Sequence, residues 1–178
     1  MNNELLPPWA RSLPKHFTAS GFVIQDGRIL LVNHRKHGVW IYPGGHVEPD
    51  ETTDEACLRE VLEETGIHCR IVSPRDESLG EPEVVEVLHI PWMVLCERIP
   101  AGNDQPEHCH IDYAYVCEPL PGESGLLAQD TRETNGIGWF SLAELVSLEL
   151  FPDFRRQTAK LLTDYPVWNV SAGNSCRR

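Results

Sequence analysis

The most constraining feature of this sequence is the stretch at 45–67, which is GHVEPDETTDEACLREVLEETGI. Thr52 is followed three residues later by Glu55, which is the spacing of a capping box, and Asp54 adds negative charge to the first turn. A helix is therefore predicted to begin near Thr53, and Gly66 is predicted to end it. Any fold of this chain must place a glycine-rich loop directly before a strongly acidic helix.

The predicted helix has two different faces. At 100° per residue, Glu60, Glu63 and Glu64 share one face and apolar residues share the other. Three carboxylates within one turn repel one another by about 4 kcal/mol per pair, at 4 Å and an effective dielectric of 20. We therefore expect a cation beside them. Hard oxygens, with no His or Cys on the same face, suit Mg²⁺ or Mn²⁺ better than zinc.

The loop before the helix adds a second constraint. Pro43, Gly44 and Gly45 allow a sharp turn and a close approach to a ligand, and a helix N-terminus suits anions. An acidic stripe alone is typical of a solvated helix face. A solvated helix, however, requires neither the glycines nor Glu51 and Arg59 at fixed offsets. The whole stretch therefore favours a site for metal and phosphate.

From Gly45 to Ile67 the chain matches G-x5-E-x7-R-E-U-x-E-E-x-G-U at every defined position, where U is a bulky aliphatic residue. The stretch thereby resembles the signature of the Nudix (MutT-like) hydrolase superfamily. Chance would match the seven fixed positions at roughly one start in 10^8 to 10^9. The resemblance extends more loosely from about His16 to Tyr165, and it implies an α/β/α sandwich with a mixed β-sheet.

The resemblance also implies a reaction and a division of roles. The reaction is Mg²⁺-dependent hydrolysis, with Mn²⁺ as a substitute, of the pyrophosphate bond of a nucleoside diphosphate linked to another group. Glu60 and Glu64 are the firmest metal ligands, and Glu63 is a ligand or the general base. Arg59 is an ion-pair partner that holds the loop and helix together. Glu51 is interpreted as a loop organiser or a water-mediated ligand.

Further candidates lie outside this stretch. Glu133, six residues before Trp139, is a candidate general base, although an exposed loop acid is the simpler interpretation. Arg35 is a candidate phosphate contact that would act with Gly44 and Gly45, although a basic turn after a strand is common.

One predicted strand carries an unusual polar face. By period-two alternation, His108, His110 and Asp112 lie on the same side. Three interpretations of this polar face stay open from the sequence. Its residues could face the substrate cleft, bind a metal or be solvated on the surface. Trp40 is predicted to pack beside the glycine-rich loop rather than to stack on a base.

The substrate is left open. Pro82 lies sixteen residues after Gly66, a placement similar to one in Nudix enzymes that act on ADP-ribose, which slightly favours ADP-ribose or a nucleotide sugar. The alternatives are a house-cleaning (d)NTP pyrophosphatase and a dinucleoside polyphosphate hydrolase. A non-catalytic nucleotide-sensing domain is an alternative of another class, and the intact acidic set weighs against it.

Composition agrees with one enzyme domain over 1–178, with a core at about 16–165 and flexible tails at both ends. The chain has 178 residues, of which 41% are hydrophobic, and its net charge of −12 disfavours a nucleic-acid surface.

No signal peptide or membrane-length apolar run is seen, so we expect a cytoplasmic protein with a nucleotide-type substrate and neither nucleic-acid nor membrane partners. Dimers are common in the resembled family, which leaves a homodimer open.

The pattern of apolar residues predicts a mixed α/β (α+β) plan. Strands at 17–25 and 28–33 form a hairpin around Asp26 and Gly27. Other strands are predicted at 68–72, 84–97, 110–117 and 138–140, with helices at 142–147 and 153–163. The six cysteines show no CxxC spacing, and we interpret them as reduced thiols.

Overall fold

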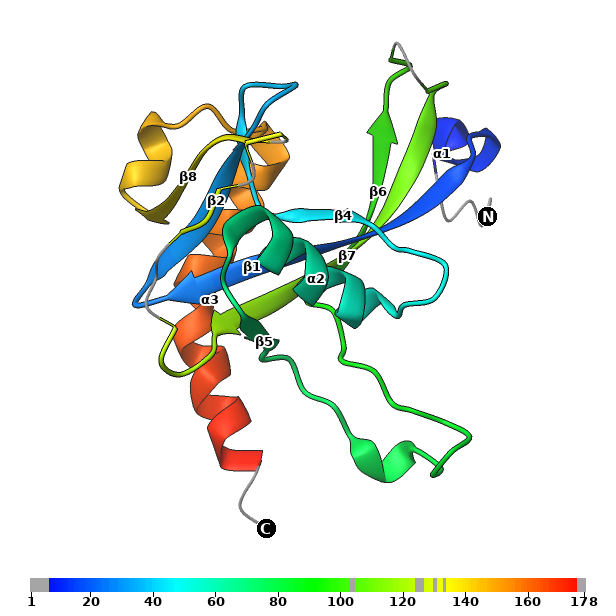
Figure 1. Cartoon of the computed structure of the whole chain (residues 1–178), viewed down its shortest axis with the longest axis vertical. Coiled ribbons are helices and arrows are strands. Elements are labelled where there is room, and N and C mark those ends of the chain that lie inside the picture. The colour runs from blue at the N-terminus through cyan, green and yellow to red at the C-terminus, as the bar shows by residue number, and fades with distance from the viewer. Residues whose placement is uncertain (1–6, 103–104, 124–126, 130, 133, 176–178) are drawn as a thin grey trace.

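The computed structural model describes residues 7–102, 105–123, 127–129, 131–132 and 134–175, with the backbone alone described for 166–175. Figure 1 shows the elements in chain order: α1 (Pro8–Ser12), β1 (Lys15–Gln25), β2 (Arg28–His34), β3 (Trp40–Ile41), β4 (Gly44–His46), α2 (Thr53–Thr65), β5 (Cys69–Ile71), the 3-10 helix η1 (Glu77–Leu79), β6 (Met93–Ile99), β7 (His108–Pro119), β8 (Thr134–Ser141), the 3-10 helix η2 (Glu144–Ser147) and α3 (Pro152–Ser175).

Within the described residues, eight strands form one mixed sheet with the central order β3-β2-β1-β7-β5. β1 is the strand that joins its two parts. From Lys15 to Val23 it runs parallel to β7, and beside β4 it is antiparallel. Its last residues form a hairpin with β2, which in turn pairs with β3 and β8. β5 and β6 both run antiparallel to β7.

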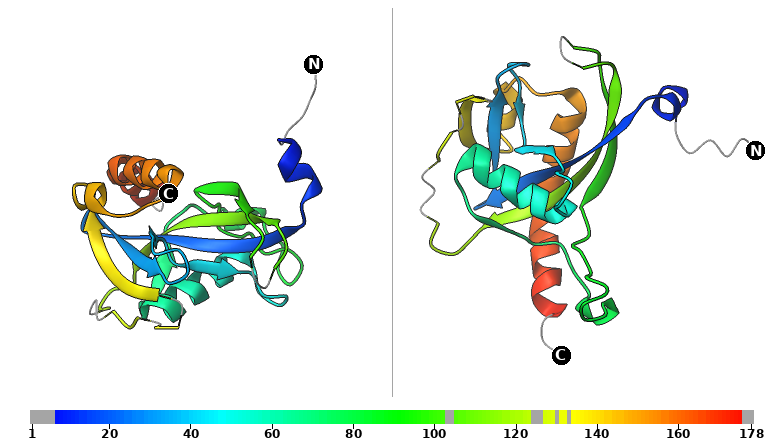
Figure 2. Two further views of the ribbon diagram at one scale, coloured as in Figure 1. Left: turned by 90° about the horizontal axis from the view of Figure 1, so that it is seen from above. Right: turned by 45° about the vertical axis from the view of Figure 1, so that its right-hand side comes forward.

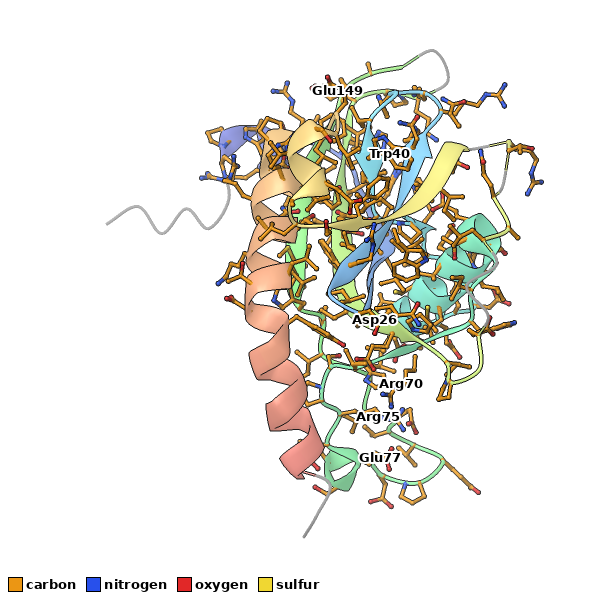
Figure 3. The ribbon with its side chains drawn as sticks, turned by 90° about the vertical axis from the view of Figure 1, so that its left-hand side faces the viewer. Asp26, Trp40, Arg70, Arg75, Glu77 and Glu149 are labelled. Atoms are coloured by element: carbon orange, nitrogen blue, oxygen red, sulfur yellow. The ribbon has the colours of Figure 1, made fainter. Side chains whose placement is uncertain are left out.

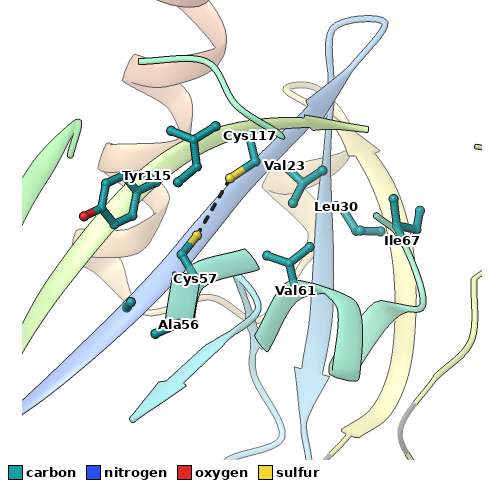
Figure 4. Packing of buried hydrophobic residues seen from close by; sticks show 10 residues of the cluster. Val23, Leu30, Ala56, Cys57, Val61, Ile67, Tyr115 and Cys117 are labelled. Carbon is teal, nitrogen blue, oxygen red and sulfur yellow. Dashed lines mark hydrogen bonds between the residues drawn. The ribbon is translucent and has the colours of Figure 1, made fainter. Parts of the chain in front are cut away.

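Helices cover both faces of this sheet, as the left view of Figure 2 shows, so the molecule has the α/β/α layers that the resemblance implied. α2 packs Cys57 and Val61 against Val23 of β1 (Figure 4). A Cβ atom on Gly21 would lie 2.5 Å from Cγ2 of Val61. Only glycine therefore allows α2 to approach β1 this closely.

The opposite face of β1 forms a second core with α3. Phe22 contacts Tyr42 and Phe154, with ring centroids 4.7 and 6.0 Å apart, and Leu161 belongs to the same cluster. Successive residues of β1 therefore face different helices, as the period-two geometry of a strand requires.

The predicted hairpin is confirmed. Asp26, labelled in Figure 3, and Gly27 have φ angles of 51° and 71° and connect β1 to β2. Both values lie in the left-handed region, as a two-residue hairpin turn of type I′ demands.

The strand predicted at 84–97 is wrong in its first half, because β6 begins only at Met93. Pro91 lacks a backbone N–H and is poorly suited to a strand with neighbours, and Val84 is 78% exposed. Residues 72–92 instead form a long excursion that contains η1. Arg75 and Glu77, joined by an ion pair of 2.6 Å, lie on it at a distance from the sheet (Figure 3).

The remaining expectations concern the chain ends and the thiols. α1 and α3 occupy part of both segments expected to be tails. The five cysteines in the described part of the chain are free, in agreement with their interpretation as reduced thiols, and Cys57 is buried in the core. None of the helices described here combines the length and apolarity of a membrane span.

Candidate active site at the acidic helix

The predicted start and end of the acidic helix are confirmed. α2 begins after Thr52, whose side chain accepts from the backbone N–H of Glu55, while the Glu55 carboxylate accepts from the backbone N–H of Thr52 at 2.8 Å. Gly66 ends the helix with φ of 72°, and its N–H donates to the carbonyl of Leu62 at 2.8 Å. These local bonds fix where the acidic face begins and which way it points.

The glycines before the helix lie against its carboxylates. The backbone N–H of Gly44 donates to Oε2 of Glu64 at 3.1 Å. A Cβ atom on Gly45 would lie 2.4 Å from Oε1 of Glu60. The loop that the sequence predicted to approach a ligand therefore approaches the acidic side chains themselves, and glycine is what permits it.

Arg59 ties the loop to the helix. Its guanidinium donates to both carboxylate oxygens of Glu51, through Nε at 3.0 Å and Nη2 at 2.6 Å. Nη2 also donates to the backbone carbonyl of His46 at 3.0 Å. Its Nη1 contacts Glu60 at 2.7 Å and Glu63 at 3.3 Å. The hydrogen bond from Arg59 lowers the pKa of Glu51 and, reciprocally, the pKa of Arg59 is raised. Both groups are therefore charged at neutral pH.

The acidic face forms one wall of a cavity of about 340 Å³. The acids of this wall differ in their exposure to solvent. Glu64 is buried, with 8% of the residue exposed, whereas the side chain of Glu63 is 57% exposed. The residues that line the cavity are Gly45, His46, Glu48, Arg59, Glu60, Glu63, Glu64 and Arg132. Carboxylate oxygens dominate the donor set, as a site for Mg²⁺ or Mn²⁺ requires, and Arg132 adds positive charge of the kind that a phosphate group would contact.

Three lining residues were missed by sequence reasoning. His46 and Glu48 lie one and three residues after Gly45, so their position beside the acids was a local signal. Arg132 adjoins Glu133, the residue that the sequence singled out in this segment. Its place in the cavity depends on the packing of a distant loop, which no local pattern encodes.

Other candidate residues lie elsewhere. Arg35 is exposed and donates through Nη1 to the carbonyl of Thr131 at 2.8 Å. It therefore supports the segment that carries Arg132 and is not among the described residues that line the cavity. Glu133 lies outside the described residues. Trp40 packs edge-on against Phe140, with ring centroids 4.8 Å apart, in agreement with its predicted packing role.

The polar face predicted on β7 exists, but its members have different surroundings. Asp112 is 1% exposed and accepts hydrogen bonds from Thr18 at 2.9 Å, Ser20 at 2.8 Å and the hydroxyl of Tyr42 at 3.2 Å. Three hydroxyl groups thus satisfy this buried carboxylate, and the two on β1 link that strand to β7. Burial nevertheless raises the pKa of Asp112, while its three hydrogen bonds act in the opposite direction.

The histidines of this face form a cluster of their own. His108 and His110 are joined on the neighbouring strand by His16, which sequence reasoning missed because the pairing of β1 with β7 spans most of the chain. Burial, followed by the proximity of His46, His108 and His16, lowers the pKa of His110 to about 4. The imidazole of His110 is therefore neutral at physiological pH.

The fold and the acidic cavity together define a class of metal-dependent phosphate enzymes, and comparison with known proteins gives the family. A family model described as "NUDIX domain" matches residues 14–164. The chain therefore belongs to the Nudix hydrolases, a family of enzymes that generally use a divalent metal on nucleotide-type small molecules.

Individual proteins agree with this assignment. The chain is 44% identical over 145 residues to phosphatase NudJ of Escherichia coli strain K12, a match that covers 78% of this chain and 92% of that protein. It is 42% identical over 76 residues to a MutT-like protein of Streptomyces ambofaciens, which covers 42% of this chain but only 47% of that relative. A Nudix hydrolase structure from Clostridium perfringens superposes with a TM-score of 0.69 at 26% identity, covering 85% of this chain and 98% of the other.

Proposed function

We propose that this protein hydrolyses the pyrophosphate bond of a nucleoside diphosphate linked to another group, with Mg²⁺ as its metal and Mn²⁺ as a substitute. The observation that carries the proposal is the wall formed by Glu60, Glu63 and Glu64, which the loop at Gly44 and the guanidinium of Arg59 hold in place. Such a wall of oxygen donors beside a cavity suits a hard cation that brings phosphate oxygens as further ligands.

Each acidic residue is given a role by its surroundings. Glu64 and Glu60 are the most enclosed and are proposed as the firmest metal ligands, with Gly44 orienting the Glu64 carboxylate. Glu63 is more exposed and is proposed as a further ligand or as the general base. When bound, the divalent ion supplies positive charge for the phosphate oxygens and acidifies the attacking water.

The remaining residues position this wall and its substrate. Arg59 is proposed as a positioning residue, and Glu51 organises the loop, since one of its oxygens also accepts from the N–H of Glu48 at 2.8 Å. Arg132 is proposed to contact a phosphate group, and Arg35 to support it through the carbonyl of Thr131. Glu133 stays a candidate for the general base, alongside Glu63.

The substrate is proposed to be ADP-ribose or a nucleotide sugar, with (d)NTPs and dinucleoside polyphosphates as alternatives. The support is the position of Pro82 in the sequence, which lies in the excursion at 72–92. The relative from E. coli carries the name phosphatase, without a stated substrate. Four further properties stay predictions: a single domain, a cytoplasmic location, the absence of nucleic-acid and membrane partners, and a homodimer.

The first experiment is a hydrolysis panel with ADP-ribose, nucleotide sugars, canonical and oxidised dNTPs and dinucleoside polyphosphates, each in Mg²⁺ and in Mn²⁺. Glu64→Gln is the inactive control, and Glu149→Gln, which changes an exposed acid outside the cavity lining, is the matched active control. Turnover of one class that only Glu64→Gln abolishes would support the proposal and name the substrate.

Failure of the panel would also be informative. A folded protein that hydrolyses none of these compounds with either metal, but binds one of them in calorimetry, would contradict catalysis. That result would favour the nucleotide-sensing alternative instead.

A further inference from the structure

We propose that His16, His108 and His110 form a second metal site, which takes a late first-row divalent ion and zinc above all. Their candidate ligand nitrogens all lie within 4.8 Å of one another, and no other group of three His, Cys, Asp or Glu side chains in the described part of the chain is gathered as closely. The proposal does not depend on the reaction assigned to the acidic cavity.

The sheet itself brings the three histidines together. His16 on β1 is the register partner of His110 on the parallel strand β7, so the two side chains leave the sheet on the same face. His108 lies two residues earlier on β7 and shares that face by alternation. Two adjacent strands therefore present a fixed row of imidazoles, which is a more rigid arrangement than a loop would give.

The distance between two of the nitrogens suits a tetrahedral ion. Nε2 of His108 lies 3.2 Å from Nε2 of His110. With zinc–nitrogen bonds of about 2.0–2.1 Å, two imidazoles on a tetrahedral zinc place their ligand nitrogens about 3.3–3.4 Å apart. These two rings therefore need almost no movement to share one ion.

A hydrogen bond already selects the nitrogen that His108 offers. Its Nδ1 lies 2.8 Å from the carbonyl oxygen of Pro106. A carbonyl can only accept, so Nδ1 carries the proton and the neutral ring of His108 has its lone pair on Nε2, toward His110. A backbone carbonyl in this position is the usual support of a metal-binding histidine.

His16 and His46 complete the surroundings. The ring of His16 stacks on His108 with centroids 4.5 Å apart, so it must turn about its side-chain bonds to direct a nitrogen at the same centre. His46 on β4 is the next neighbour, with its ring 4.9 Å from that of His110 and 5.7 Å from that of His16. His46 is thus placed to supply a fourth ligand.

The chemistry of this cluster differs from that of the acidic cavity. Neutral imidazole nitrogens prefer zinc, cobalt, nickel or copper, whereas the carboxylates of Glu60 and Glu64 prefer Mg²⁺ or Mn²⁺. The two sites adjoin at His46, which lines the cavity and whose carbonyl accepts from Arg59 at 3.0 Å. An ion at the histidines would join β1, β7 and β4 at the edge of the active site.

The experiment is a zinc titration of the untagged full chain, freed of metal and kept in excess Mg²⁺, in competition with a chromophoric chelator. We expect one equivalent of zinc to bind. His16→Ala and His110→Ala should weaken binding by about 100-fold or more, whereas His68→Ala, which removes an exposed histidine, and Glu64→Gln should leave it unchanged. Circular dichroism in chelator establishes that each variant is folded.

Cobalt provides a second measurement that needs no variant. Co²⁺ in place of zinc should give the intense visible absorption of a tetrahedral nitrogen site. The proposal is overturned if the wild type binds no zinc in excess Mg²⁺, if both histidine variants bind like the wild type, or if cobalt gives only the weak spectrum of an octahedral ion. The short contact between His108 and His110 would then be an ordinary hydrogen bond between imidazoles.

Discussion

Arg59 holds both carboxylate oxygens of Glu51, through Nε at 3.0 Å and Nη2 at 2.6 Å, and thereby fastens the loop before α2 to the helix itself. The same guanidinium contacts Glu60 at 2.7 Å. Because the side chains of Glu51 and Glu60 are each only 14% exposed, solvent compensates poorly for the loss of Arg59. The position of Glu60, a proposed metal ligand, therefore depends in part on Arg59, which is proposed to act by positioning alone.

Removal of Arg59 should consequently affect catalysis. We expect Arg59→Ala to lower the turnover rate by about 10- to 100-fold, as loss of an outer partner of a metal site commonly does, and to raise the Mg²⁺ concentration at half-maximal rate. Steady-state kinetics at several Mg²⁺ concentrations measures both. Arg70→Ala, which breaks the exposed pair with Glu118, is the control and should leave them unchanged. Unaltered kinetics in Arg59→Ala would remove its positioning role.

Gly45→Ala tests the close approach of the loop to Glu60. The added Cβ would lie 2.4 Å from a carboxylate oxygen at the end of a flexible side chain, so Glu60 can turn away. We expect stability to change by less than about 1 kcal/mol and the rate to fall by about tenfold or more, because a metal ligand is displaced. Gly102→Ala, whose Cβ meets only the end of Lys36 at 3.3 Å, is the control. Thermal unfolding and kinetics separate the two effects.

The graded exposure of the acidic wall leads to a third prediction. Glu64 is nearly buried and oriented by Gly44, whereas Glu63 is exposed. Glu64→Gln should cut the rate by about 100-fold or more and produce the larger increase in the Mg²⁺ requirement. Glu63→Gln should change the requirement less. Metal titrations of the two variants side by side measure this, and equal requirements would contradict the ranking of these ligands.

Glu97 should make the stability of the protein depend on pH. Burial, followed by the nearby charges of Asp112 and Asp153, raises its pKa from 4.5 to about 7, against a hydrogen bond from Tyr42 that lowers it. An acid whose pKa rises on folding binds its proton more tightly in the native state, so stability is lost as the pH increases from about 4.5 to about 7. The loss from this one group is about 2–3 kcal/mol.

Glu97→Gln isolates that contribution. The amide cannot ionise, so the variant should gain stability relative to the wild type at pH 8 and show little gain at pH 5. Denaturant unfolding at both pH values measures the difference. A gain that is the same at pH 5 and pH 8 would mean that Glu97 titrates normally.

Local signals predicted the acidic helix better than they predicted the sheet. The cap at Thr52 and the stop at Gly66 depend on neighbours within one helical turn, so the sequence contained everything needed to place α2. The strand predicted at 84–97 failed in its first half because a run of β-forming residues cannot show that the strand begins only after Pro91, at Met93. Arg132 and His16 were missed for another reason, since each reaches its cluster through contacts with distant parts of the chain.

β1 contacts the elements that carry both the acidic cavity and the histidine cluster. Gly21 lies under α2, a Cβ atom on Gly44 would meet the Ser20 hydroxyl oxygen at 2.5 Å, and His16 belongs to the histidine cluster. A small slide of this strand along its axis would displace all three at once. The acidic cavity and the imidazole cluster thus rest on one strand, and we expect a variant that shifts β1 to alter both.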